Sequence, residues 1–296
     1  DCLPVVGAYV GADITAGVVA SEMAETDALT LFIDVGTNGE IVLGNRDWLI
    51  TCACSAGPAF EGSGVRHGMR ATAGAIEEIW IDHRTLEPTY QTIGQLPARG
   101  ICGSGMIGLL AEMFITGILD KAGKIQRDLP TPRVRVGDHG GEYVVVWASQ
   151  SAVGTDIVIN EVDIENLLRT KGAIYAGFSV LVQSVGITLA DVEQVLIAGA
   201  FGQYINVEKA IQIGLLPDMP WDRFHYLGNT SALGAFYSLV SREMRRNVTE
   251  VAEKMTYLEL SADNTFYDQF MSALFLPHTD ITTFPSVMRV LQASTS

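Results

Sequence analysis

The fold of this chain is decided by the stretch Leu31-Phe-Ile-Asp-Val-Gly-Thr-Asn-Gly-Glu-Ile-Val-Leu43. Two apolar runs flank a polar turn, Asp34-Val-Gly-Thr-Asn-Gly-Glu40, and this pattern is typical of a β-hairpin. Gly36 and Gly39 are predicted to take positive φ, which lets successive backbone N–H groups point into one concavity. We therefore expect two strands joined by a turn that is rich in hydrogen-bond donors.

This turn has two interpretations. In the first, Thr37 and Asn38 add side-chain donors to the concavity, and Asp34 at its mouth holds a divalent cation or an attacking water. The turn then binds nucleotide phosphates and Mg²⁺. In the second it is an ordinary hairpin, because Asn-Gly is a strong signal for a type I′ turn. The rest of the chain bears on this choice.

Length and composition limit the protein classes. The 296 residues form one large domain or two modest ones, and a hydrophobic content of 48% with 18% charged residues indicates a packed globular core. The net charge of −15 argues against non-specific nucleic-acid binding. No apolar run has the length of a membrane span, the N-terminus is no signal peptide, and four cysteines do not indicate a disulfide framework. We expect a cytoplasmic protein without nucleic-acid or membrane partners.

The N-terminal residues do not have the pattern that is typical of the start of a protein. They lack an initiator Met and start inside an apolar, strand-like run, and residues 13–23 then form a predicted helix capped by Asp13. We therefore expect a fragment of a longer polypeptide.

Further along, hairpins are followed by alternating strands and helices, which predicts the α/β class. Residues 121–141, with three prolines, are predicted to be a surface excursion. Asn160 or Asp163 is the expected cap of a long helix. Strands are predicted at 47–54, 76–82, 89–93, 144–147, 156–159, 192–198, 224–227 and 256–260. A helix is predicted to open in the glycine-rich segment 100–105 and to end near residue 118. Further helices are predicted at 163–185, 206–213 and 232–246, and in the tail that ends near 275.

Glycine-rich junctions follow two of the later strands. These junctions are Gly199-Ala-Phe-Gly202 and Gly228-Asn-Thr-Ser231. Ligands of α/β sheets bind at the carboxyl ends of strands, where glycine permits close backbone approach and helix N-termini favour anions. Together with the turn after Asp34, they predict a phosphate-binding edge.

The order of these motifs resembles the second lobe of the actin, Hsp70 and sugar-kinase ATPase superfamily. Residues 34–40 resemble its second phosphate hairpin, 196–202 its adenosine motif and 228–234 the start of its second connecting helix. The helix from Asp13 resembles the first connecting helix, and in relatives this helix begins with the residue that positions the nucleophile or its water. A plain helix cap is the alternative for Asp13.

A narrower resemblance extends from about Val6 to Pro277. It is to the reductive activators of corrinoid proteins, ATP-dependent proteins that return cob(II)amide to cob(I)amide. The stretches that carry it are 10–13, 33–41, 56–62, 100–105, 171–177 and 198–202, which read VGAD, IDVGTNGEI, AGPAFEG, GICGSG, KGAIYAG and AGAFG.

The resemblance implies an actin-like, ribonuclease H-like lobe with a mixed sheet flanked by helices. Residues 1–28 would be the end of the first lobe and the connecting helix, 29–250 the second lobe with its surface insertion at about 121–141, and 251–296 a C-terminal extension. The family's [2Fe–2S] domain and first phosphate motif are absent from this sequence, so the chain alone is expected to be inactive. It would supply half of the site for ATP and Mg²⁺.

The residue roles implied by the resemblance are specific. Asp13 is the expected catalytic residue and Asp34 the expected contact to Mg²⁺ through the nucleotide. The predicted nucleotide-binding residues are Asp34, Gly36, Thr37, Asn38, Gly39, Glu40, Gly199, Ala200, Phe201, Gly202, Gly228 and Asn229.

Two further features have a structural and a functional interpretation. Cys52, Cys54 and Cys102 are expected to be buried small hydrophobes, with a metal or cluster site as the alternative. Ser63, Arg66 and His67, in a glycine-rich loop, either face a corrinoid partner, with His67 as a cobalt ligand, or simply cover the core.

The leading hypothesis is the C-terminal part of an ATP-dependent activator for a corrinoid protein of a methyltransferase system. The alternatives are a phosphotransferase of the sugar- or acetate-kinase type and a non-catalytic lobe for partner binding or dimerisation, so a homodimer stays open.

Overall fold

The computed structural model describes residues 2–36, 38–199 and 204–294. The chain divides into two compact units, each formed by three segments. The first unit is Asp1–Ser55, Ala173–Tyr204 and Met219–Phe270, and the second is Ala56–Gly172, Ile205–Asp218 and Met271–Ser296. Each unit is described by itself.

A six-stranded mixed sheet forms the centre of the first unit, in the order β11-β10-β1-β2-β3-β12. β1 pairs in parallel with β10, β10 with β11 and β3 with β12, whereas β2 is antiparallel to both β1 and β3. The strands are β1 (Thr30–Val35), β2 (Gly39–Gly44), β3 (Leu49–Cys54), β10 (Gln194–Ala198), β11 (Phe224–Gly228) and β12 (Met255–Tyr257).

The hairpin predicted at the start of the sheet is confirmed, with Asp34 opposite Glu40 and Val35 opposite Gly39. The conformation predicted for Gly39 is wrong, because this residue lies in β2 without positive φ. A Cβ at Gly39 would lie 2.9 Å from Cγ1 of Ile174. Glycine is therefore required there by close packing against a helix rather than by turn conformation.

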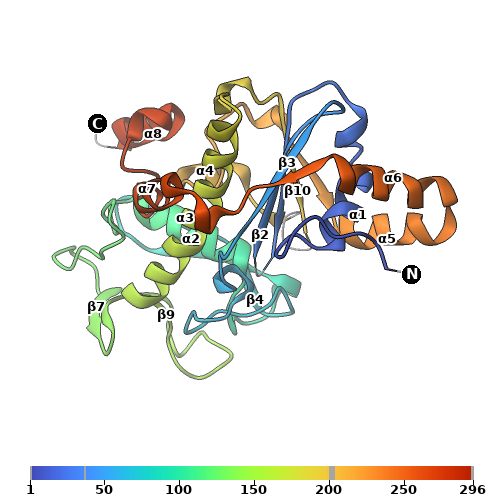
Figure 1. Cartoon of the computed structure of the whole chain (residues 1–296). Coiled ribbons are helices and arrows are strands. Elements are labelled where there is room, and N and C mark those ends of the chain that lie inside the picture. The colour runs from blue at the N-terminus through green and yellow to red at the C-terminus, as the bar shows by residue number, and fades with distance from the viewer. Residues whose placement is uncertain (1, 37, 200–203, 295–296) are drawn as a thin grey trace. The chain divides into compact units, whose positions relative to one another are not determined.

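Three helices cover one face of this sheet: α1 (Ala12–Ser21), α5 (Thr230–Val240) and α6 (Arg242–Lys254). They lie side by side on one flank of the sheet in Figure 1. α1 and α5 cross at very short range, since a Cβ at Gly234 would lie 2.0 Å from the carbonyl oxygen of Ala16. The core between helices and sheet includes Ile14, Val18 and Phe32, all fully buried.

The other face is covered by the second half of α3 (Glu161–Ser184). Cys52 and Cys54 point to this face, and the Cys52 thiol donates to the carbonyl of Gly177 at 3.8 Å. A Cβ at Gly177 would lie 2.2 Å from the Cys54 sulfur. Small residues on both elements thus allow the helix to lie close to the sheet.

The second unit contains two three-stranded sheets, β5-β4-β6 and β7-β8-β9. α2 packs on β4 so closely that a Cβ at Gly105 would lie 2.2 Å from the carbonyl oxygen of Ile76. The elements are β4 (Ala75–Ile81), β5 (Pro88–Thr92), β6 (Gly100–Ile101), β7 (Val134–Gly137), β8 (Gly140–Val146), β9 (Ile157–Asn160), α2 (Gly103–Ile115), α4 (Val207–Gln212) and α8 (Pro285–Ser294), while α7 (Asn264–Ala273) crosses the boundary between the units.

Several element predictions need correction. The single helix predicted for 232–246 is interrupted at Ser241, whose extended backbone separates α5 from α6 and whose side chain caps α6. The segment 121–141 ends in strand, because Val134–Gly137 pairs with β8. α8 lies beyond the predicted end of the last helix. Asn160 is the cap of α3, since its side chain accepts from the N–H groups of Val162 and Asp163.

Within the described part of the chain, no helix combines the length and the apolar character that crossing a bilayer requires.

Candidate nucleotide site

The predicted phosphate-binding residues meet at one edge of the six-stranded sheet. β1, β10 and β11 are parallel, so their carboxyl ends share this edge, and β2 starts there. In the register, Ala198 pairs with both Asp34 and Gly228, and Asp34 also pairs with Glu40. Residues almost 200 positions apart in the sequence are thereby brought into one row.

Asp34 and Glu40 form a half-buried acidic pair in this row. Burial is the largest cause that raises the pKa of Asp34, the charge of Asp13 adds to it, and a hydrogen bond from the Ser231 hydroxyl at 3.4 Å opposes it. Burial, followed by the charges of Asp34 and Asp13, raises the pKa of Glu40 to about 7, against the effect of an Asn38 side-chain hydrogen bond. Three carboxylates therefore act on one another at this edge.

No Lys, Arg or His of the described residues forms an ion pair with any of these three carboxylates. A cation that approaches these carboxylates stabilises their charged forms. The described residues contain no group of three or more metal-ligating side chains arranged to hold an ion. Mg²⁺ needs no such cage, because it is usually held by one or two carboxylates, waters and the phosphates of a nucleotide. The residues present fit Mg²⁺ carried by a nucleotide.

Asp13 is not the cap of α1, which corrects the structural interpretation of this residue. The helix begins at Ala12 after Gly11, and no side chain caps it. Asp13 lies in the first turn and is exposed. Its carboxylate is thus not occupied by a capping hydrogen bond.

Gly199 and Gly228 keep the backbone close to Asp34. Gly199 has φ +90°, and a Cβ there would lie 2.7 Å both from Oδ1 of Asp34 and from the carbonyl oxygen of Val35. Its N–H donates to the carbonyl of Gly228 at 3.0 Å. Only glycine combines this conformation with this approach, so Gly199 brings backbone without a side chain against Asp34.

Two of the remaining residues predicted to bind nucleotide have structural hydrogen bonds. The Gly36 N–H donates to the carbonyl of Asn38 at 3.0 Å, which closes the hairpin turn. The Asn229 side chain accepts from the N–H of Ala232 and caps α5. Thr37, Ala200, Phe201 and Gly202 lie outside the described residues.

Two residues at the start of α5 were not predicted individually. Ser231 donates to Asp34, and the Thr230 hydroxyl is buried with no partner among the described residues. The junction 228–231 carried the signal, because a helix that begins directly after a strand at the ligand edge presents its first turn to the site.

The glycine-rich loop of the second unit is held by α3. Asp163 accepts from the backbone N–H of Arg66 at 2.8 Å, and the Arg66 side chain lies 3.7 Å from Glu142. Ser63 and Arg66 are exposed, but Nε2 of His67 is buried without a partner among the described residues. Burial lowers the pKa of His67. In this conformation Nε2 is not accessible to a cobalt atom of another protein.

The cysteine prediction is confirmed for the three buried thiols. Cys52, Cys54 and Cys102 are at most 1% exposed and unpaired, and Cys102 donates to the carbonyl of Ile76 at 3.2 Å. They serve as small core residues.

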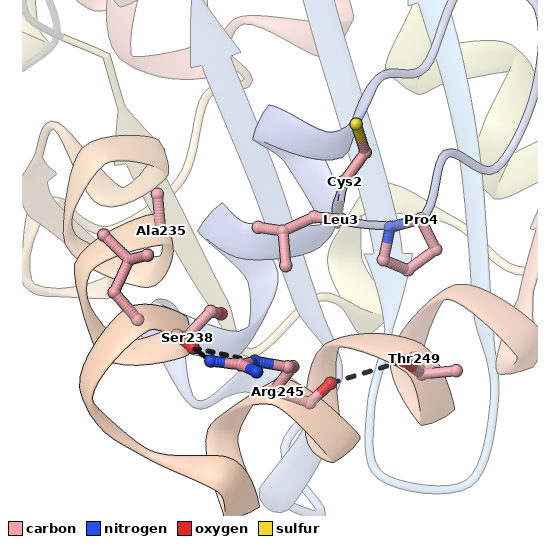
Figure 2. Close-up of a pocket in the computed structure, with 8 residues that line it drawn as sticks. Cys2, Leu3, Pro4, Ala235, Ser238, Arg245 and Thr249 are labelled. Carbon is pink, nitrogen blue, oxygen red and sulfur yellow. Dashed lines mark hydrogen bonds between the residues drawn. The ribbon is translucent and has the colours of Figure 1, made fainter.

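A hollow of about 530 Å³ lies between the N-terminal residues and the helices α5 and α6. Figure 2 shows Leu3 and Pro4 across it from Arg245, whose guanidinium donates to the carbonyl of Ser238. Among its described lining residues Arg245 alone is charged, and this charge is already engaged. The described lining therefore offers no carboxylate for a metal ion, and its one cationic side chain is turned to a backbone carbonyl.

Comparison with known proteins identifies the family of this chain. Residues 28–288 match the family described as the C-terminal domain of RACo, the ASKHA domain. The chain belongs to this family. The mixed sheet flanked by helices is accordingly the actin-like ATPase fold that the hairpin and the glycine junctions predicted.

Among known relatives, the corrinoid activation enzyme RamQ of Eubacterium limosum is 36% identical over 276 residues, which cover 91% of this chain and 46% of RamQ. The [Co(II) methylated amine-specific corrinoid protein] reductase of Methanosarcina barkeri is 28% identical, over 92% of this chain and 50% of the reductase. A solved structure of a reductive activator for corrinoid, iron-sulfur protein matches with a TM-score of 0.92 and 54% identity, over 96% of this chain and 45% of that one. The ASKHA domain described here thus spans about half the length of these relatives.

Proposed function

We propose that this chain is the ATPase part of a reductive activator that returns cob(II)amide to cob(I)amide in a corrinoid protein of a methyltransferase system. The observation that carries the proposal is the group of three carboxylates formed by Asp13, Asp34 and Glu40. These carboxylates have no cationic partner among the described residues, and they act on one another at the ligand edge of an ASKHA sheet. The names of the relatives point to corrinoid activation.

The residues of this edge divide the work on ATP. Asp34, oriented by the Ser231 hydroxyl, would hold the Mg²⁺ of the nucleotide, and Glu40 beside it adds negative charge. When bound, Mg²⁺ neutralises the charge of the phosphates. Gly199 keeps the approach to Asp34 open, and the exposed Asp13 carboxylate orients the attacking water and accepts its proton.

ATP is hydrolysed to ADP and phosphate, and cob(II)amide gains one electron to become cob(I)amide. The electron would come from a [2Fe–2S] centre outside this chain. Nucleotide drives the cycle only if the partner binds the ATP and ADP states with different affinity. The exposed Ser63 and Arg66 of the second unit belong, in this proposal, to the surface that meets the corrinoid protein.

The nucleotide half of the proposal is tested by Gly199→Ala with Gly186→Ala as the matched control. Both glycines have positive φ, but a Cβ at Gly186 meets nothing within 4 Å, whereas one at Gly199 meets Asp34. The positive φ costs each variant about 1–2 kcal/mol. A Cβ at Gly199 also meets the carbonyl oxygen of Val35 at 2.7 Å, so thermal unfolding must first show that Gly199→Ala is folded. Isothermal titration with Mg·ATP should show binding to the wild type and to Gly186→Ala, and a loss of about tenfold or more in Gly199→Ala. Equal affinity in all three would contradict the assignment of this edge.

The corrinoid half is tested by binding to a corrinoid protein that holds cob(II)amide. Its affinity for the chain should differ about fivefold or more between saturating Mg·ATP and Mg·ADP, measured by biolayer interferometry. An affinity that does not depend on the nucleotide would remove the activator role. Rapid phosphorylation of acetate or a sugar by Mg·ATP would establish the phosphotransferase instead.

A further inference from the structure

A second pocket opens beside the phosphate hairpin, within the first unit. Its volume is about 370 Å³, in the range of small-molecule sites. Asn38 of the hairpin and Ser55, directly after β3, line one side, and residues that follow β12 line another. Of the described residues predicted to bind nucleotide, Asn38 alone lines this pocket.

Aromatic rings form much of its wall. Phe266 and Phe270 stand one turn apart on α7, with their ring centroids 6.2 Å apart and the ring planes inclined by 16°. Tyr9, 67% exposed, lines the pocket as well. Three rings therefore line one small space, and an aromatic ring attracts a cation that lies over its face.

A single carboxylate, that of Glu259, completes the lining. It accepts from the hydroxyl of Ser261 at 2.8 Å and from that of Tyr257 at 3.1 Å, and these bonds hold the pKa of Glu259 below its usual range. No Lys, Arg or His of the described residues pairs with it. The pocket therefore combines aromatic surface with an uncompensated negative charge.

We propose that this pocket binds a small alkylammonium ion of about the size of choline. An anionic occupant is repelled by Glu259. A neutral apolar molecule leaves the carboxylate without a counter-charge. A substituted ammonium group satisfies both features, because its methyl groups pack against Phe266, Phe270 and Tyr9 while its charge faces the rings and the carboxylate.

The test uses choline and its neutral carbon isostere, 3,3-dimethylbutan-1-ol, on the full chain. Both molecules have the same shape, so only charge separates them. Saturation-transfer NMR titrations should show choline binding at least about tenfold more tightly than the alcohol. Equal affinity would overturn the proposal, since the pocket would then be merely apolar, and so would an absence of choline binding.

Variants locate the binding site. Phe270→Leu keeps an apolar side chain but removes a ring, and Glu259→Gln removes the charge but keeps the size of the side chain. Each should weaken choline binding about tenfold. Tyr267→Ala is the control, because this exposed ring of the same helix does not line the pocket. Its affinity should equal that of the wild type. Unchanged affinity in both Phe270→Leu and Glu259→Gln, with thermal unfolding showing that both are folded, would overturn the assignment. Neither titration contains nucleotide, so the result is independent of the proposed ATPase.

Discussion

The second unit and the ligand edge of the first unit treat buried charge in opposite ways. In the second unit Lys209 forms an ion pair with Glu112, whose other oxygen accepts from the N–H of Ile81 at 2.8 Å. Lys171, fully buried, donates to the carbonyls of Phe275 at 2.5 Å and Pro277 at 2.8 Å. Each of these charges has several fixed partners.

At the ligand edge the half-buried carboxylate of Asp34 accepts a hydrogen bond from Ser231, and that of Glu40 accepts from its own backbone N–H and from Asn38. The charge of Asp13 repels both carboxylates. A buried charge with fixed partners makes the removal of one partner costly, whereas charges without partners reduce stability until a ligand brings the counter-charge. The difference separates structural charge from a binding site without reference to sequence motifs.

The largest effect is expected where a partnered charge loses its partner. Glu112→Ala leaves Lys209 with only Gln212 and leaves the N–H of Ile81 unpaired, so the free energy of unfolding should fall by about 3–5 kcal/mol in urea denaturation. Arg169→Ala, which breaks an exposed pair with Glu165, is the control and should cost less than about 0.5 kcal/mol. Similar losses in both variants would erase the distinction between buried and exposed pairs.

A somewhat smaller loss is expected at Lys171, which fastens the segment after α7 to α3. Lys171→Ala removes two hydrogen bonds and leaves a cavity, so the free energy of unfolding should fall by about 3 kcal/mol. Lys171→Met keeps the aliphatic volume and avoids the burial of a charge, and its loss should be clearly smaller. If Met costs as much as Ala, the two hydrogen bonds rather than packing hold this segment.

The sequence predicted which residues lie at the ligand edge better than it predicted the contacts and burial that shift their pKa values. Asn-Gly between two alternating strands determines the hairpin, and the antiparallel register then places Asp34 opposite Glu40. The hydroxyl of Ser231 comes from 197 residues away, and the burial that raises the pKa of Glu40 exists only in the folded unit. Local pattern contains no information on such tertiary contacts.

The errors have equally local causes. The break between α5 and α6 was missed because no glycine or proline stands within residues 235–246, although serine is a good helix cap. Gly39 was assigned to the turn, but it is small because Ile174 of a distant helix packs against it. In both cases the residue type can be read from the sequence. The contact that explains it cannot.

The pH dependence of stability sharpens the comparison at Glu40. Its pKa rises from 4.5 in the unfolded chain to about 7 in the folded protein, so the folded state binds the proton more tightly between these values. The contribution of Glu40 to stability is therefore fully present below pH 4.5 and is lost as the pH rises through about 7. Urea denaturation from pH 4.5 to 8 should show wild type losing on the order of 2 kcal/mol relative to Glu40→Gln. Parallel pH profiles would show that the carboxylate is not under strain.

The smallest change in stability, and the only gain, is expected for Asp34→Asn. The amide removes a half-buried charge that Asp13 and Glu40 repel and still accepts the Ser231 hydrogen bond, so the chain without nucleotide should become more stable by about 1 kcal/mol. Mg·ATP at 100 times its dissociation constant should stabilise the wild type by about 2.7 kcal/mol and the variant far less. The pKa of Glu40 should also fall, because one of the charges that raise it is gone. A variant that loses stability but keeps the nucleotide effect would mean that Asp34 is a structural charge like Glu112, and that the counter-charge it lacks is not supplied by Mg²⁺.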